Sequence, residues 1–172
     1  MKPRPSTLPT IETERLLLRA MGPEDGPALL AIYGDPEVMR YASDEPFADL
    51  ETVGLMLASV ARLLAAGESL EWAVVERATG QVVGTCGLHS FDEAADAAEV
   101  GCMLARAAWG RGLMGEALPA LFRYAGEGLG VRLLRADIDA PNLRSIGLFA
   151  RLGFAHSGGS LYERELGGSE AA

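Results

Sequence analysis

The sequence lacks the features on which several classes of protein depend. It holds 15 lysine and arginine residues against 24 aspartate and glutamate residues, which gives a formal net charge of −9. Nucleic-acid binding requires a basic surface, so this charge balance argues against it. No apolar run reaches the length of a membrane span, and the N-terminal stretch lacks the apolar core of a signal peptide. We therefore expect a cytoplasmic protein with neither a nucleic-acid partner nor a membrane partner.

Cysteine is scarce as well. Cys86 and Cys102 each fall inside a predicted strand, which is typical of buried thiols that stay reduced in the cytosol. Neither lies at a helix terminus, where a thiol would be activated, so we expect no acyl-enzyme intermediate. No metal site is predicted.

The apolar content is high enough for a packed core. Hydrophobic residues make up 49% of the 172 residues, which is ordinary for one globular domain. We place that domain at residues 12–166. Residues 1–11, which carry three prolines, are expected to form a flexible lead-in, and residues 167–172 a small polar tail.

The order of the predicted elements indicates an α+β fold. After a first strand at residues 12–21, three strands joined by short connections form an antiparallel meander at residues 70–76, 82–91 and 97–104. Apolar residues at helical spacing follow at residues 116–129, so the next strand, at residues 131–138, runs parallel to the strand before the helix. We predict a mixed central sheet, made of the meander and one parallel pair, flanked by this helix and by helices at residues 23–33, 50–66 and 142–152.

A glycine-rich loop joins the last meander strand to the helix that follows it. The loop reads Gly110-Arg-Gly112-Leu-Met-Gly115. Glycine allows backbone angles and a close approach that a β-carbon forbids, so several N–H groups can face one space. The helix adds the free N–H groups of its first turn and the positive end of its dipole. The loop is thus predicted to bind an anion such as a diphosphate.

Two interpretations of this loop are open. Gly110-x-Gly112-x-x-Gly115 has the form of the dinucleotide-binding fingerprint, and Asp137, at the end of the next strand, stands where a ribose-binding acid would be. That fingerprint places its first glycine at the end of the strand, but here residues 105–109 intervene. A meander rather than a second βαβ unit also precedes the loop, which disfavours a dinucleotide domain.

Two motifs instead resemble those of the GNAT acetyltransferase superfamily. The stretch from Trp109 to Met114 resembles the acyl-CoA pyrophosphate loop, except that Met114 replaces a small residue. The stretch from Asn142 to Phe154 resembles the second signature of the family at every spacing. Together with the opening Thr-Glu-Arg-Leu-Leu-Leu-Arg at residues 13–19, the resemblance covers residues 12–166. It is closest to the branch that acetylates the N-terminal amines of ribosomal proteins.

The resemblance implies a GNAT-like fold that binds acetyl-CoA. The two parallel strands would splay apart and leave backbone groups free to bond the amide groups of pantetheine, and Arg111 would help to neutralise the diphosphate. The implied cofactor-binding residues are Cys102, Met103, Leu104, Trp109, Gly110, Arg111, Gly112, Leu113, Met114, Gly115, Asn142 and Ser145.

The resemblance also assigns catalytic roles. Glu99, at the start of the central strand, is the candidate base that takes the proton of the acceptor amine through water, ahead of His89 and Asp92. Many relatives carry a tyrosine at the position of Phe149 that protonates the leaving thiolate. Phenylalanine has no hydroxyl group, so the role of the acid passes to Ser145.

The implied function is an acetyl-CoA-dependent N-acetyltransferase in which a primary amine attacks the thioester directly. The acceptor would be a peptide or protein N-terminus or a small-molecule amine, and a homodimer is compatible with this function. Because Phe149 and Met114 depart from the family pattern, a non-catalytic acyl-CoA-binding domain that regulates or scaffolds a partner is the alternative.

Overall fold

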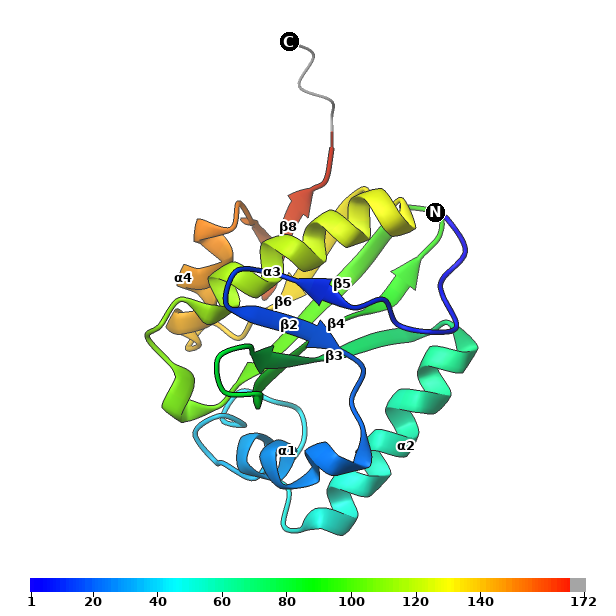
Figure 1. Ribbon diagram of the computed structural model, residues 1–172. Helices are drawn as coiled ribbons and strands as arrows, with labels where there is room; N and C mark the ends of the chain where they lie inside the picture. The colour runs from blue at the N-terminus through cyan, green and yellow to red at the C-terminus, as the bar shows by residue number, and fades with distance from the viewer. Residues whose placement is uncertain (168–172) are drawn as a thin grey trace.

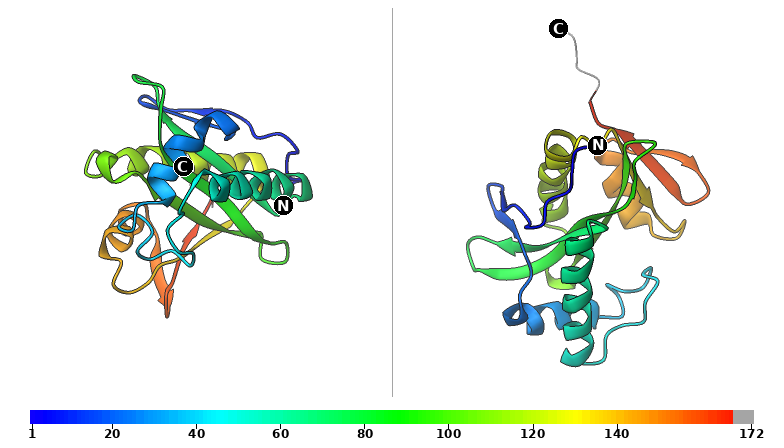
Figure 2. Two further views of the ribbon diagram at one scale, coloured as in Figure 1. Left: turned by 90° about the horizontal axis from the view of Figure 1, so that it is seen from below. Right: turned by 90° about the vertical axis from the view of Figure 1, so that its right-hand side faces the viewer.

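The computed structural model describes residues 1–167 and contains an eight-stranded mixed sheet with helices on both sides (Figures 1 and 2). The strands lie in the order β1-β2-β3-β4-β5-β6-β8-β7. Their bounds are β1 (Ile11–Glu12), β2 (Leu16–Arg19), β3 (Ser69–Glu76), β4 (Gln81–Asp92), β5 (Ala97–Leu104), β6 (Leu133–Asp137), β7 (Ala155–Gly158) and β8 (Leu161–Glu165). The α+β architecture predicted from the element order is confirmed.

Two helices cover one side of the sheet, α1 (Gly26–Tyr33) and α2 (Leu50–Ala66), and α3 (Leu113–Arg123) covers the other (Figure 1). The Asp49 carboxylate caps α2 by accepting from the Thr52 N–H at 2.9 Å. Gly67 ends this helix in the left-handed region, at φ 70°. Among residues 1–167, no helix combines the length and the apolar character that a membrane span needs.

The helix after the glycine-rich loop and the helix after Asn142 each begin next to a residue of one of the two motifs. Gly112, at φ 71°, is the N-cap of α3, so this helix begins three residues before the predicted position 116. It ends in a π-helical turn, Tyr124–Gly128. Asn142 caps α4 (Leu143–Arg151) through its side-chain oxygen, which accepts from the Ser145 N–H at 3.3 Å. The Asn142 side chain therefore caps the first turn of α4, whereas Gly112 begins α3 without a side-chain cap.

The predicted splayed pair is present at the centre of the sheet. β5 and β6 are parallel and remain in register only from Ala97 opposite Leu133 to Glu99 opposite Arg135. β5 then continues to Leu104 without a partner on that side, while its other edge stays paired with β4. The β5 edge is thus open where β6 leaves it.

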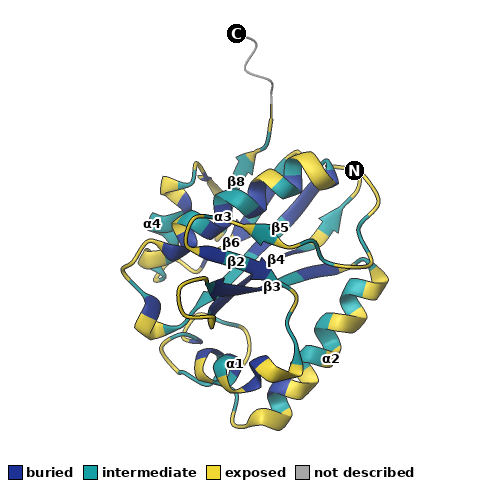
Figure 3. Cartoon of the chain, in the orientation of Figure 1, coloured by how far each residue is buried: buried dark blue, intermediate teal, exposed yellow. Residues whose placement is uncertain are grey.

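The core fills the space between the sheet and α3 (Figure 3). Trp72 on β3 and Phe122 on α3 are its largest fully buried side chains. The ring centroid of Phe154 lies 5.6 Å from that of Phe122 and 5.0 Å from that of Phe149, which ties α4 to the same core. Cys86 is buried in this core, and both cysteines are free thiols.

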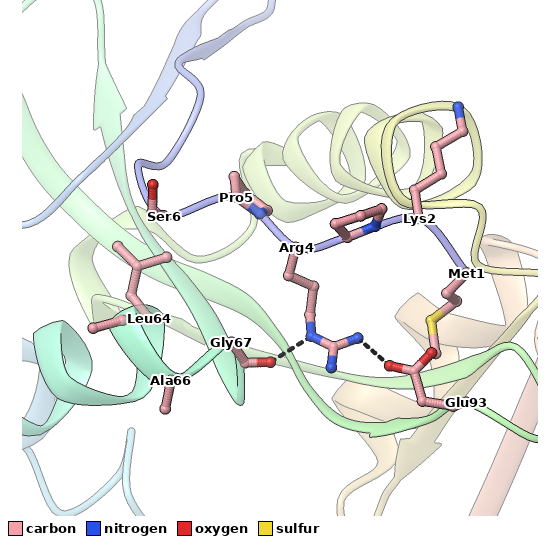
Figure 4. Close-up of a pocket in the computed structure, with 11 residues that line it drawn as sticks. Met1, Lys2, Arg4, Pro5, Ser6, Leu64, Ala66, Gly67 and Glu93 are labelled. Atoms are coloured by element: carbon pink, nitrogen blue, oxygen red, sulfur yellow. Dashed lines mark hydrogen bonds and ion pairs between the residues drawn. The ribbon is translucent and has the colours of Figure 1, made fainter.

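The N-terminal segment differs from the flexible lead-in that its prolines predict. The Met1 ammonium donates to the Asp96 carboxylate at 2.7 Å, and the Lys2 N–H donates to the Leu129 carbonyl at 2.7 Å. Arg4 donates to the Gly67 carbonyl and, at 2.7 Å, to the Glu93 carboxylate (Figure 4). Charge pairs with the turn between β4 and β5 hold this segment along a depression of about 460 Å³. Of the predicted tail, residues 168–172 lie outside the described residues.

The predicted first strand at residues 12–21 is divided into β1 and β2. The Thr13 N–H donates to the Leu16 carbonyl at 2.9 Å and closes a tight turn, so that Ile11 pairs with Leu18. This turn lies beside α3 and brings Thr13 and Arg15 to the glycine-rich loop.

Candidate functional site

A cleft of about 790 Å³ opens where β5 and β6 part. One wall is β5 from Glu99 to Leu104, and the opposite wall is the end of β6 with the first turn of α4. Residues 37–44, which follow α1, close one side. The Tyr41 hydroxyl donates to the Pro141 carbonyl at 3.2 Å and joins this segment to the loop between β6 and α4.

The open edge of β5 offers backbone groups to this cleft. The Ala105 N–H donates to the Val83 carbonyl on β4 at 2.8 Å. Because backbone groups alternate sides along a strand, those of Leu104, Cys102 and Val100 point into the gap. The Leu104 carbonyl accepts from the Trp109 indole N–H at 2.8 Å, which fixes the ring beside the strand.

Met103 is among the implied cofactor-binding residues together with Cys102, but the backbones of the two residues face opposite sides. The Cα partner of Met103 is Thr85 on β4, and by the same alternation its N–H faces β4 rather than the cleft. It therefore lines the cleft but does not offer its N–H to a developing oxyanion there. The strand was predicted correctly, but only the pairing of β5 with β4 shows that the Met103 N–H faces β4 and the Cys102 N–H faces the cleft.

The glycine-rich loop presents free backbone N–H groups. Gly110 and Gly112 adopt φ values of 77° and 71°, which favour glycine. Within the described part of the chain, no acceptor bonds the six consecutive N–H groups from Gly110 to Gly115. Leu113 and Met114 are buried, so these two residues offer the site backbone rather than side chain.

The Arg15 side chain contacts the glycine-rich loop through the carbonyl groups of the loop. Its guanidinium donates to the Arg111 carbonyl at 2.9 Å and contacts the Gly112 carbonyl at 3.5 Å. In a trans peptide the C=O and N–H groups point in opposite directions, so the following N–H groups are turned away from Arg15. This arrangement explains why the opening Thr-Glu-Arg belongs to the same motif set as the loop.

Glu116 completes this support. Its carboxylate accepts from the Thr13 hydroxyl at 2.5 Å and from the Arg15 Nε at 2.7 Å. Burial alone would raise the pKa of the Glu116 carboxyl, but these hydrogen bonds outweigh it and the pKa is lowered. A permanent carboxylate in the first turn of α3 therefore fixes Arg15.

The Met114 departure from the family pattern is accommodated by Gly84. A β-carbon at Gly84 would lie 2.9 Å from the Met114 methyl group and 2.4 Å from the Met103 carbonyl oxygen. The Met114 side chain thus occupies space that the glycine leaves free, and it does not obstruct the loop backbone.

The arginine beside the cleft is not the one that the sequence predicts. Arg111 turns away from the loop and pairs with Glu76 on β3. Arg144, in the first turn of α4, stacks its guanidinium on the Trp109 ring with its central carbon 3.4 Å from the ring centroid, and it lines the cleft. Among the described residues no carboxylate pairs with Arg144. In the sequence, the position of Arg144 next to Ser145 in the second motif indicates that it lies at the site.

The candidate catalytic residues lie on opposite walls. Glu99 stands at the last paired position of β5, with His89 Nδ1 3.7 Å from its Oε2. Ser145 and the buried Phe149 lie on α4, Asn142 lies at its N-cap, and all three line the cleft. Asp92 does not line the cleft: its carboxylate accepts from two N–H groups of the β4–β5 turn and from Arg135, which lowers its pKa.

Comparison with known proteins gives consistent results. A model described as an acetyltransferase (GNAT) domain matches residues 15–155. The uncharacterized N-acetyltransferase p20 of Bacillus licheniformis is 34% identical over 149 residues, covering 87% of this chain and 84% of that protein.

Solved structures share the fold. A candidate ribosomal-protein-serine acetyltransferase of Vibrio cholerae superposes with a TM-score of 0.79 at 20% identity, over 96% of this chain and 100% of that one. The microcin C7 self-immunity acetyltransferase MccE, in complex with acetyl-CoA and AMP, superposes with a TM-score of 0.80 at 13% identity, over 90% of this chain and 94% of that one.

Proposed function

This chain belongs to the GNAT acetyltransferase family and is an acetyltransferase that uses acetyl-CoA; on that premise we propose that it transfers the acetyl group to a primary amine by direct attack on the thioester. The observation that carries the proposal is the cleft between β5 and β6, because it runs from Trp109 and Met114, at the two ends of the glycine-rich loop, to Glu99. One domain at residues 12–166, as predicted, would hold both ends of this path.

We place the diphosphate on the N–H groups of Gly110 to Gly115. A helix N-terminus and consecutive free amides stabilise an anion, and Arg144 supplies the nearby cation in place of Arg111, which Glu76 already neutralises. The pantetheine amides would bond the backbone of Val100, Cys102 and Leu104, with the Asn142 amide group on the opposite wall. Trp109 and Met103 contribute packing surface.

Catalysis then rests on three groups of the chain. The Glu99 carboxylate attracts the positively charged ammonium group of the acceptor into the cleft. It also accepts a proton from this group through water, as a general base. The Cys102 N–H, which faces the gap, donates to the carbonyl oxygen as negative charge develops on it. The Ser145 hydroxyl donates a proton to the departing sulfur, since Phe149 cannot.

The acceptor is proposed to be a peptide or protein N-terminus or a small-molecule amine. Deprotonating an α-amine with a pKa near 8 costs about 1.4 kcal/mol at pH 7, against about 4.6 kcal/mol for a lysine amine near 10.4. A base that acts through water therefore favours the α-amine. The two free thiols fit a cytoplasmic location, and a homodimer remains compatible with the open edges of the fold.

The test is turnover. Purified protein is incubated with acetyl-CoA and a panel of peptides with N-terminal serine or alanine, an N-terminally blocked lysine peptide and small primary amines. Thiol release and the mass of the product are followed. Release of thiol together with an acetylated amine supports the proposal. Tight binding of CoA with no turnover of any amine would instead support the non-catalytic acyl-CoA-binding domain, which the Phe149 departure favours.

A further inference from the structure

Gly87 and Gly101 leave an area without side chains on the two central strands, which we call the glycine floor. Gly87 on β4 and Gly101 on β5 are direct partners in the register, and Gly87 is also the partner of Glu71 on β3. Registered residues of neighbouring antiparallel strands share a face of the sheet. This is the face that α1 covers, because Thr85, two residues from Gly87, hydrogen-bonds the Tyr33 hydroxyl at 2.7 Å. Gly101 lines the cleft.

Two side chains reach over this floor from opposite sides. A β-carbon at Gly87 would lie 2.5 Å from the carboxyl carbon of Glu71, so the carboxyl group itself occupies that space. A β-carbon at Gly101 would lie 3.6 Å from Nε2 of His89, which also lines the cleft. Adjacent strands are about 4.8 Å apart. The Glu71 carboxyl is therefore one strand away from the cleft, with no side chain on the two glycines between them.

Glu71 is unusual because it is mostly enclosed, with part of its surface still accessible, and has no cation beside it. Among the described residues no lysine, arginine or histidine pairs with it, and the Ser69 hydroxyl is the polar group beside it. Burial raises the pKa of the Glu71 carboxyl to about 7, and the Ser69 hydrogen bond opposes part of this rise. A buried carboxyl of this kind costs stability when it ionises, so a catalytic use is a reason for its presence.

The titratable groups around Glu71 do not compete for a proton at neutral pH. Burial raises the pKa of the Tyr33 hydroxyl on α1 and of the Cys86 thiol on β4, and it raises the pKa of the Cys102 thiol on β5 to about 12. All three groups therefore stay neutral in the pH range in which Glu71 changes its charge. His89 and Glu99 face the same floor from its outer end.

We propose that Glu71 is the final proton acceptor of the amine site, reached from the cleft across the floor of Gly87 and Gly101. This inference rests on the proposed function and adds a second carboxylate to Glu99. The acceptor ammonium gives one proton to a water above Gly101, and that water gives one proton to a Glu71 oxygen. The freed nitrogen lone pair forms the N–C bond while the C–S bond breaks. The nitrogen gives its second proton through water to Glu99, and the Ser145 hydroxyl gives its proton to the departing sulfur. The proton on Glu99 then returns through water to Ser145, so that one proton remains on Glu71.

The experiment compares the pH dependence of kcat/KM for wild type and Glu71→Gln, with the amine that wild type acetylates fastest. The titration of the amine itself is common to both proteins, so the ratio of wild type to variant isolates Glu71. This ratio is expected to stay near 1 at about pH 5.5 and to rise to at least about tenfold at about pH 8.5, because only an ionised base accelerates proton removal. A purely structural role would give a ratio that does not change with pH.

Two further variants test the position and the acidity of the Glu71 carboxyl separately. Gly87→Ala places a methyl group where the carboxyl lies, so it should reproduce the loss, and the double variant should lose no more than either single one. Glu71→Asp keeps the acid and should restore part of the rise with pH.

Matched controls separate this effect from general damage. Glu68→Gln removes an exposed acid near the same strand, and Gly54→Ala adds a methyl group in open space on α2. Both should follow the wild-type profile. If wild type is active and the ratio for Glu71→Gln is flat with pH, Glu71 is not the acceptor and the proposed function still stands. If wild type acetylates no amine, the proposed function and this inference both fail.

Discussion

Replacing Glu71 with glutamine should make folding stability less dependent on pH. The Glu71 carboxyl has a pKa of about 7 in the folded protein, raised by burial, against 4.5 as its ordinary value. Between these values the folded protein keeps a proton that the unfolded chain has lost. The stability associated with this proton is therefore fully present below pH 4.5 and is lost as the pH rises through about 7.

The size of the effect follows from the same two values. At 1.36 kcal/mol for each pKa unit, the difference corresponds to about 3 kcal/mol of unfolding free energy. Glutamine fills nearly the same volume and cannot ionise. We therefore expect Glu71→Gln to match wild type at about pH 4.5 and to exceed its unfolding free energy by about 3 kcal/mol at about pH 8.

Urea denaturation at a series of pH values, followed by tryptophan fluorescence, measures this difference directly. Other titrating groups contribute equally to both proteins and cancel, provided that the slope against urea is unchanged. Glu68→Gln, which removes an exposed acid, should show a difference that is independent of pH. A flat difference for Glu71→Gln, or one that grows as the pH falls, would refute the reasoning about Glu71.

Two further substitutions test the packing, and two test the cofactor site. Gly54→Ala should raise the unfolding free energy by about 1 kcal/mol in thermal denaturation, because α2 has open space at this position and alanine favours a helix. Gly84→Ala should lower it by about 1–3 kcal/mol, because the new β-carbon would meet the Met103 carbonyl oxygen at 2.4 Å. In calorimetric titrations with CoA, Arg144→Ala should weaken binding by about tenfold and Arg111→Ala by less than about threefold, because Arg111 is already paired with Glu76; equal losses would contradict the assignment of the cation.

The sequence was sufficient for the parts of the fold that depend on local patterns. The caps Asp49, Gly67 and Asn142 are residue types that begin or end helices by themselves, and the structure uses each of them in that way. Short connections require an antiparallel meander, and a helix between two strands requires a parallel pair. Glycine inside a strand is typical of a bulge or a close neighbour, and the structure shows a register shift opposite Gly84 and the Glu71 carboxyl over Gly87.

Features that depend on tertiary pairing could not be predicted. Prolines at the N-terminus indicate a loose segment, but the partner of the Met1 ammonium, Asp96, is distant in the sequence. For the same reason the sequence could not show that Arg111 would pair with Glu76. Glu71 is an ordinary polar position in a strand pattern, and only the register that brings it over Gly87 makes it a candidate for function.

Calorimetric titration of CoA into Gly115→Asp and Gly115→Asn tests the central claim most directly, namely that the cofactor diphosphate lies on the loop from Gly110 to Gly115. Gly115 is exposed, has open space around its Cα and lies in the first turn of α3, so both side chains fit and aspartate even favours the helix. At an effective dielectric near 20, a carboxylate about 5 Å from a phosphate charge repels it by about 3 kcal/mol. Gly115→Asp should therefore bind CoA more than about a hundredfold more weakly than wild type, and Gly115→Asn should remain within a few-fold. If the two variants bind CoA equally well, the diphosphate does not lie on this loop.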